Sequence, residues 1–139
     1  MMDIKLRNYQ EECINLINSL EGGRYLIQMA TGLGKTVVFT NIERKGKVLV
    51  LAHREELIRQ PIKYYDCEVG IEQGENTSNG EEVVIASVQS LINRLPKFSQ
   101  DEFDTIIIDE CHHSAAKSYR KILDYFDPRL LLRFFCNTK

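Results

Sequence analysis

The sequence has no hydrophobic run long enough to cross a membrane, and its opening residues, Met-Met-Asp-Ile-Lys, form no apolar segment typical of a signal peptide. It also has no internal repeat, no low-complexity tract and no recognisable interdomain linker. These absences argue against transmembrane helices and solenoid architectures. We therefore expect one cytoplasmic domain over the 139 residues, a length sufficient for a hydrophobic core.

Cysteine is scarce, and no two cysteines form a Cys-x-x-Cys pair. The wide spacing argues against a disulfide framework or a zinc ribbon. We expect buried thiols in a reducing compartment. The four positions are Cys13, Cys67, Cys111 and Cys136.

The chain also lacks an excess of positive charge, since its formal net charge is −2. No global basic field therefore indicates a nucleic-acid partner. A locally basic groove stays compatible with this balance, because several lysines and arginines lie close together in the first half of the chain, such as Arg44, Lys45 and Lys47. An ordinary solvated surface explains the same distribution, and both interpretations remain open.

Predicted strands and helices alternate along the chain. Continuous apolar runs predict two strands buried on both faces, 47–52 and 103–109. Other patterns predict strands over 24–28, 69–71 and 82–87, an apolar strand near 130, and a polar loop over 73–80. Helices are predicted over 8–20, from the end of the glycine-rich segment to about 44, over 54–66 with a bend at Pro61, over 88–95 and over 116–126. This alternation predicts an α/β fold with right-handed crossovers and a parallel sheet.

A glycine-rich segment between the first strand and the next helix has the chemistry of a phosphate-binding loop. It fits the pattern G-x-x-x-x-G-K-[ST], except that methionine replaces the first glycine. In such a loop the lysine is a point charge for the β- and γ-phosphates, and the Thr36 hydroxyl is a ligand for Mg²⁺. The alternative is a glycine-rich turn with a chance Lys-Thr. The segment consists of Met29, Ala30, Thr31, Gly32, Leu33, Gly34, Lys35 and Thr36.

Two acidic residues, Asp109 and Glu110, follow the apolar run 106–108. Ligands of open α/β sheets bind at the carboxyl ends of the strands, where the phosphate loop would also lie. There Asp109 can hold a magnesium ion, and Glu110 can orient and deprotonate an attacking water. Standing alone, an Asp-Glu pair is more often a solvated turn. A zinc site at the adjacent Cys-His-His, residues 111–113, is disfavoured because consecutive residues rarely point at one ion.

At this point the sequence resembles the superfamily 2 (DEAD/DEAH-like) helicases. Residues 109–112 match the D-E-x-H box, 29–36 match motif I, 49–57 resemble motif Ia, 85–91 resemble the strand-end motif that follows it, and 6–10 resemble the adenine-recognition element. The motif Ia form and the two consecutive histidines are most similar to the branch of type III restriction-enzyme helicase subunits and DNA-repair helicases. The resemblance implies an N-terminal RecA-like domain, a three-layer P-loop NTPase fold with a central, mainly parallel sheet.

The resemblance also implies roles for individual residues, with ATP and Mg²⁺ as cofactors. Gln10 would hydrogen-bond adenine with Arg7 beside the base, and His112 would couple the nucleotide site to the nucleic acid or to a partner domain. A sequence-independent contact with a nucleic-acid backbone would come from Ala52, His53, Arg54, Ser87, Gln89 and Ser90. Without the resemblance, several of these residues could be exposed helix-start residues, and Ser87 and Gln89 could form a helix cap.

Helicases of this superfamily use two RecA-like domains, and the sequence contains one. We expect residues 1–139 to form domain 1, truncated before motif III, with the second domain and its arginine absent. One choice of codons for Leu132–Thr138, read one base later, encodes Leu-Gly-Phe-Ser-Ala-Thr-Pro, which resembles motif III and suggests a frameshift. The expected function is an ATP-dependent helicase or translocase domain, on DNA rather than RNA, with little activity alone. The alternatives are a nucleotide-binding module without turnover and an unrelated P-loop kinase.

Overall fold

The computed structural model describes residues 8–29, 32–53, 58–110 and 116–136. Six strands form one sheet in the order β1-β6-β5-β2-β4-β3, and every neighbouring pair is parallel. The strands are β1 (Gly23–Met29), β2 (Val48–Ala52), β3 (Val69–Glu72), β4 (Val83–Ser87), β5 (Thr105–Glu110) and β6 (Leu130–Cys136). The predicted α/β fold with a parallel sheet is confirmed.

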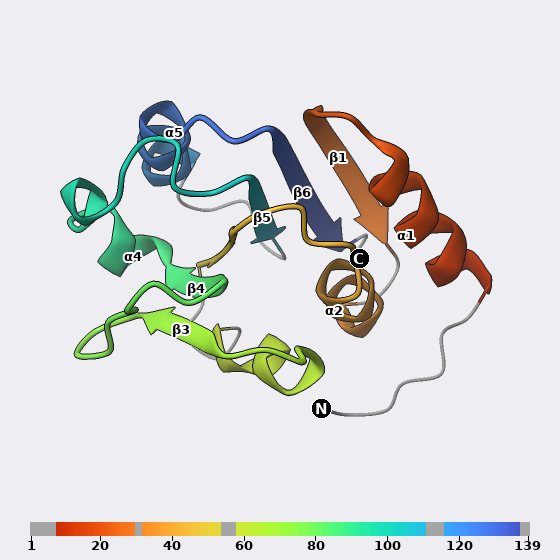
Figure 1. Ribbon diagram of the computed structural model, residues 1–139, viewed down its shortest axis with the longest axis horizontal. Coiled ribbons are helices and arrows are strands. Elements are labelled where there is room, and N and C mark those ends of the chain that lie inside the picture. Colours follow the sequence, from red (N-terminus) through yellow and green to blue (C-terminus); the bar gives the residue numbers. More distant parts are fainter. Residues whose placement is uncertain (1–7, 30–31, 54–57, 111–115, 137–139) are drawn as a thin grey trace.

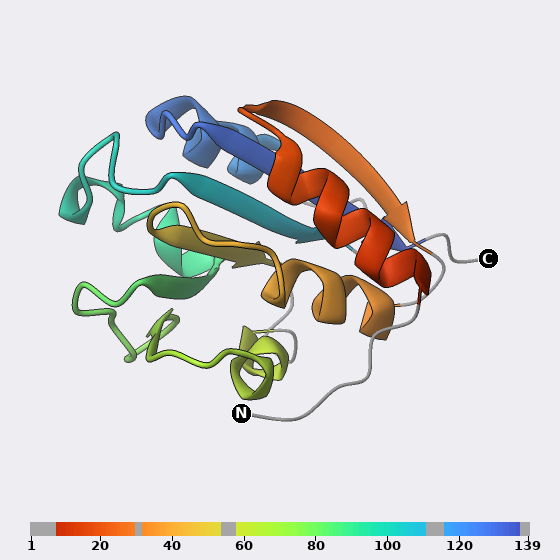
Figure 2. The same ribbon diagram turned by 45° about the vertical axis from the view of Figure 1, so that its right-hand side comes forward.

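Helices cover both faces of the sheet, which gives the molecule three layers (Figures 1 and 2). One face carries α1 (Asn8–Ser19), α2 (Gly32–Thr40) and the 3-10 helix η1 (Gln60–Tyr64), and the other carries α4 (Val88–Leu91) and α5 (Ala116–Tyr125). A second 3-10 helix, η2 (Leu95–Lys97), follows α4. None of the helices in the described part of the chain is long and apolar enough to span a membrane.

The structure confirms that β2 and β5, which correspond to the predicted strands 47–52 and 103–109, are buried on both faces. Every residue of β2 is buried, because its alternate side chains enter different cores. Val48 and Val50 pack with α1 and α2, whereas Leu49 and Leu51 pack with α4 and α5.

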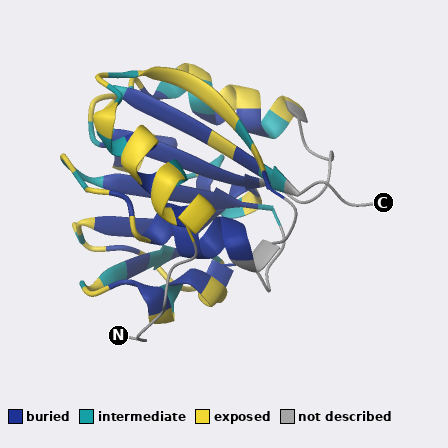
Figure 3. Ribbon diagram, turned by 90° about the vertical axis from the view of Figure 1, so that its right-hand side faces the viewer, coloured by how far each residue is buried: buried dark blue, intermediate teal, exposed yellow. Residues whose placement is uncertain are grey.

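The first strand is less buried than its apolar sequence suggests. β1 lies at the edge of the sheet, and Figure 3 shows it largely in the colour of exposed residues. Leu26 is 63% exposed, and Leu16 on the neighbouring helix is 64% exposed. The buried face of α1 therefore consists mainly of Ile14 and Ile17.

Two helices end earlier than the sequence predicts. α2 ends at Thr40 rather than near residue 44, and there the Thr40 hydroxyl donates to the Thr36 carbonyl and the Asn41 amide donates to the Val37 carbonyl. Side chains that bond the backbone in this way compete with continuation of the helix. α4 ends at Leu91 rather than 95, and Pro96 lies in η2. The predicted helix over 54–66 is described only from residue 58, and this part ends as the 3-10 helix η1. Pro61 lies in the first turn of η1.

The predicted strand near residue 130 is β6, which pairs with β1 and β5. Leu132 and Phe134 are fully buried, while Arg133 between them is exposed. Cys13 and Cys67 are free thiols, but they are half-buried rather than buried as predicted. The side chains of the other two cysteines lie outside the described residues.

Candidate functional site

The sheet register brings the predicted site residues to one edge, the carboxyl ends of the strands. Asp109 at the end of β5 is aligned with Ala52 at the end of β2, and Ala52 is aligned with Ser87 at the end of β4. On the other side, Glu110 is aligned with Phe135 of β6, and the next β6 residue is aligned with Met29 at the end of β1. The phosphate-loop segment and the acidic pair thus begin two strands apart on the same edge.

At the centre of this edge is a buried ion pair. Lys35 lies in the first turns of α2, and its Nζ donates to Asp109 Oδ1 over 2.5 Å. Only 1% of the lysine side chain and 5% of the aspartate side chain are exposed. Thr36 is also buried. An ammonium, a hydroxyl and a carboxylate at a helix N-terminus are the groups expected around a magnesium–nucleotide complex.

The predicted adenine contact, Gln10, is buried in the first turn of α1. Tyr9 beside it is half exposed. The other predicted contact with the base, Arg7, lies outside the described residues, as do Ala30, Thr31, Arg54 and His112. The backbone of Gly32, Leu33 and Glu110 is described, but their side chains are not.

The predicted nucleic-acid residues lie at the ends of β2 and β4. Ala52 is buried, and His53 is half-buried with a buried Nδ1 that has no partner among the described residues. Ser87 is the N-cap of α4, because its Oγ accepts a hydrogen bond from the Ser90 amide over 3.2 Å. The capping alternative therefore applies to Ser87, whereas Gln89 is exposed.

Sequence reasoning missed a buried carboxylate on the same edge, Glu72 at the end of β3. Its side chain is 0% exposed and forms ion pairs with Arg94 and Lys97. The available signal is a glutamate that directly follows the apolar run 69–71, in the position that Asp109 has after the apolar run 106–108.

A shallow cavity of about 270 Å³ lies beyond the opposite end of α2 and is lined by Asn41, Arg44, Asp66 and Glu82 among others. Arg44 there is paired with Asp66 at 3.0 Å and with Glu82 at 3.2 Å. Its charge is already compensated, so the cavity offers no obvious anion site. The carboxyl edge therefore remains the candidate site.

A parallel sheet with a buried lysine–aspartate pair at its carboxyl edge is the arrangement expected of a RecA-like domain. The family model described as "Type III restriction enzyme, res subunit" matches residues 3–135. The chain belongs to this family. This confirms the resemblance to superfamily 2 helicases in the restriction-enzyme branch.

Individual relatives agree with this assignment. IRC3 of Saccharomyces cerevisiae, named as an ATP-dependent helicase, is 43% identical over 87% of this chain and 21% of its own length. A type I restriction enzyme EcoAI endonuclease subunit of Escherichia coli is 31% identical over 86% of this chain and 18% of its own. This chain thus spans about a fifth of the curated relatives it matches.

Solved structures share the fold. The UvsW helicase of bacteriophage T4 superposes with a TM-score of 0.71 at 19% identity, over 96% of this chain and 53% of its own. A fragment of an HsdR subunit of a type I restriction enzyme from Vibrio vulnificus superposes with a TM-score of 0.61 at 28% identity, over 96% of this chain and 26% of its own. A Schizosaccharomyces pombe relative, 36% identical over 88% of this chain and 23% of its own length, is named as mitochondrial, and the cytoplasmic location expected here stays a prediction.

Proposed function

We propose that this chain is the ATP-binding domain of a nucleic-acid helicase or translocase, and that it binds ATP with Mg²⁺ at the carboxyl edge of the sheet. The family match supports an ATP-dependent domain of the helicase class. The observation that carries the proposal is the buried pair of Lys35 and Asp109, held at the N-terminus of α2 and the end of β5.

The pair has the charges that a magnesium–nucleotide complex requires. Without a ligand, each charge neutralises the other inside a site with little exposure to water. In the bound state, Lys35 would hold phosphate oxygens, while Thr36 and Asp109 would hold Mg²⁺, which supplies charge stabilisation at the phosphates. Each buried charge then keeps a counter-charge, so the exchange leaves neither uncompensated.

Other residues follow from the same proposal. Glu110, next to the metal ligand, would orient and deprotonate the attacking water. Gln10 would contact adenine from α1, and His112 would couple the site to nucleic acid or to a second domain.

We further propose that the face containing Gln89 and Ser90 contacts the backbone of a nucleic acid without reading its sequence. DNA is favoured over RNA because the family is named for a restriction enzyme. Binding of matched DNA and RNA oligonucleotides at low salt tests this preference.

Hydrolysis by this chain alone should be slow. An arginine supplied by a partner domain is worth about 10³–10⁵ in rate for this chemistry. A steady-state ATPase assay with and without DNA tests the proposal. Turnover near the enzyme median of about 10 s⁻¹, stimulated by DNA and lost in Glu110→Gln, would contradict the expected inactivity. Nucleotide binding without any turnover would favour the second candidate, a binding module that acts without hydrolysis.

A further inference from the structure

The carboxylate of Glu72 is buried in a cluster of donors beside the loop 73–80. Its Oε1 accepts from Arg94 over 3.0 Å, and its Oε2 accepts from the amide and hydroxyl of Ser78 over 2.9 and 2.5 Å. Lys97 also donates to Oε2. Burial of the carboxylate opposes ionisation, but these hydrogen bonds outweigh it and hold the pKa of Glu72 below its ordinary value.

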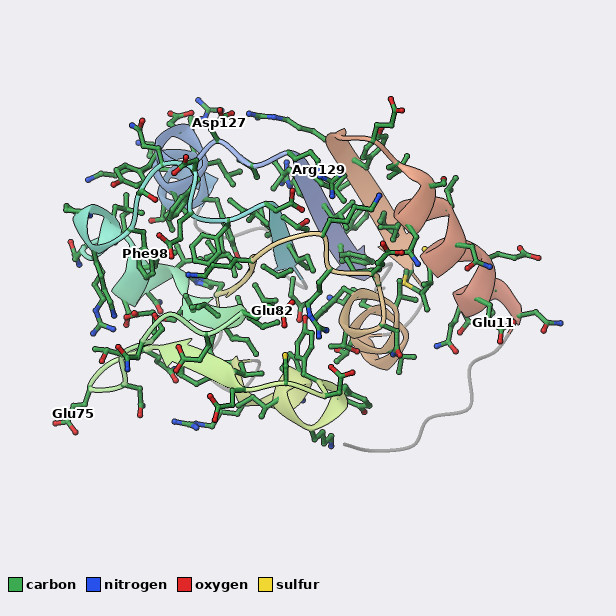
Figure 4. The ribbon with its side chains drawn as sticks, viewed as in Figure 1. Glu11, Glu75, Glu82, Phe98, Asp127 and Arg129 are labelled. Carbon is green, nitrogen blue, oxygen red and sulfur yellow. The ribbon has the colours of Figure 1, made fainter. Side chains whose placement is uncertain are left out.

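The two cations that surround this carboxylate also hold the backbone of the loop. Arg94 donates to the carbonyl of Asn76 over 3.1 Å and to that of Gly74, and Lys97 donates to the carbonyl of Ser78 over 2.9 Å. Glu72 therefore compensates the charges of both side chains that fix the loop. Figure 4 shows the loop's Glu75 pointing away from the body of the molecule.

The loop in turn contacts α4. Gly74 has a φ of 57°, which favours glycine, and its amide donates to Ser90 Oγ over 3.0 Å. A serine hydroxyl has one proton and two lone pairs. Because the Gly74 amide donates to this oxygen, the hydroxyl proton of Ser90 points away from Gly74 and can be donated to another acceptor. A phosphate oxygen of a nucleic acid has the required chemistry.

We propose that Glu72 is a positioning residue for the nucleic-acid face: through Arg94 and Lys97 it fixes the loop, so that the Gly74 amide orients the Ser90 hydroxyl toward a backbone phosphate. This inference rests on the proposed function. A carboxylate suits the role because it accepts from several donors at once, which an apolar or amide side chain cannot match.

The experiment measures the affinity of a fluorescent oligo-dT strand at low salt for the wild type, Glu72→Gln, Ser90→Ala and the double variant. We expect each single variant to bind roughly tenfold more weakly, as for one lost hydrogen bond to a charged group. The double variant should bind no more weakly than Glu72→Gln, because both changes remove the same contact. Ser90→Thr, which keeps a hydroxyl, should retain the affinity. Thermal stabilisation by Mg-ADP should be unchanged throughout.

Glu102→Gln is the matched control, because Glu102 is also paired with a lysine, Lys47, but precedes β5 at the opposite edge. It should bind oligo-dT as the wild type does. If Glu72→Gln does not fold, Arg94→Gln replaces it, since Arg94 holds the Gly74 carbonyl and its loss leaves Lys97 on the carboxylate.

Wild-type affinity in the folded Glu72 or Arg94 variant would overturn the inference, as would additive losses of about a hundredfold in the double variant. Either result leaves the proposed function intact. A wild type that binds Mg-ADP but no oligonucleotide contradicts the nucleic-acid part of the proposed function, and this inference with it.

Discussion

At the scale of single residues, the feature that most needs explanation is the buried pair of Lys35 and Asp109. Removing two charges from water is costly, and buried ion pairs are often no more stabilising than apolar residues of similar volume. Fold stability therefore does not explain why this pair is present. A site whose lysine binds an anion and whose aspartate binds a cation does explain the pair.

This explanation predicts the result of a double-mutant cycle. Lys35→Met and Asp109→Leu should each destabilise the fold by about 3–5 kcal/mol, because each leaves an uncompensated buried charge. The double variant should lose much less than the sum of the two, since both charges are gone. Urea denaturation gives the three free energies of unfolding. Additive losses would show that the two side chains do not interact as described.

At the scale of elements, β6 and β1 contribute differently to the core although they are paired. Leu132 of β6 is fully buried, whereas Leu26 of β1, next to Arg133 in the register, is 63% exposed. Leu132→Ala should therefore lower the free energy of unfolding by about 2–5 kcal/mol, and Leu26→Ala by no more than about 0.5 kcal/mol. Comparable losses in the two variants would contradict the placement of β1 at the sheet edge.

A second element-scale contact ties the starts of β5 and β6 together. Arg129 donates to both carboxylate oxygens of Asp104, over 2.9 and 3.0 Å, and also to the Glu21 carbonyl after α1. The guanidinium hydrogen bonds outweigh the opposing effect of burial and hold the pKa of Asp104 below its ordinary value.

The lowered pKa fixes the sign of a pH effect. The pair stabilises the fold fully above the unfolded-state pKa of about 3.9, and this contribution disappears as the pH falls through the lower folded-state value. Asp104→Asn should lower the free energy of unfolding by about 1.5–3 kcal/mol at pH 7 and flatten its decline in acid. Urea midpoints from pH 7 to pH 2 measure both effects. An unchanged acid slope would mean that other carboxylates dominate.

The comparison of sequence with structure shows where local patterns carry information. The runs 47–52 and 103–109 predicted central strands correctly, because burial on both faces demands continuous apolar sequence. The exposure of Leu26 was not predictable, since strand order places β1 at the edge and strand order depends on distant segments. Glu72 was missed for the same reason: its two cations come from residues more than twenty positions along the chain.

At the scale of the whole molecule, the two ends of the sheet differ: one has contacts that stabilise the fold, and the other has the candidate site. The amino end is closed by contacts such as Asp104 with Arg129, which involve chain segments far apart in sequence and stabilise the fold. The carboxyl end gathers the phosphate-loop segment, the acidic pair and the strand ends of β2 and β4. This chain matches about a fifth of the length of its relatives. The frameshift suggested for Leu132–Thr138 stays a prediction that the gene sequence can decide.

The central claim is that this edge binds a magnesium–nucleotide complex through Lys35 and Asp109. The most direct measurement is the thermal unfolding midpoint with millimolar Mg-ADP, for the wild type and for the Lys35→Met/Asp109→Leu double variant, which has no unpaired charge. The wild type should be stabilised by about 2.7 kcal/mol at a ligand concentration a hundred times the Kd, and the double variant by none. A folded wild type without stabilisation, or a double variant stabilised as much as the wild type, would contradict the account.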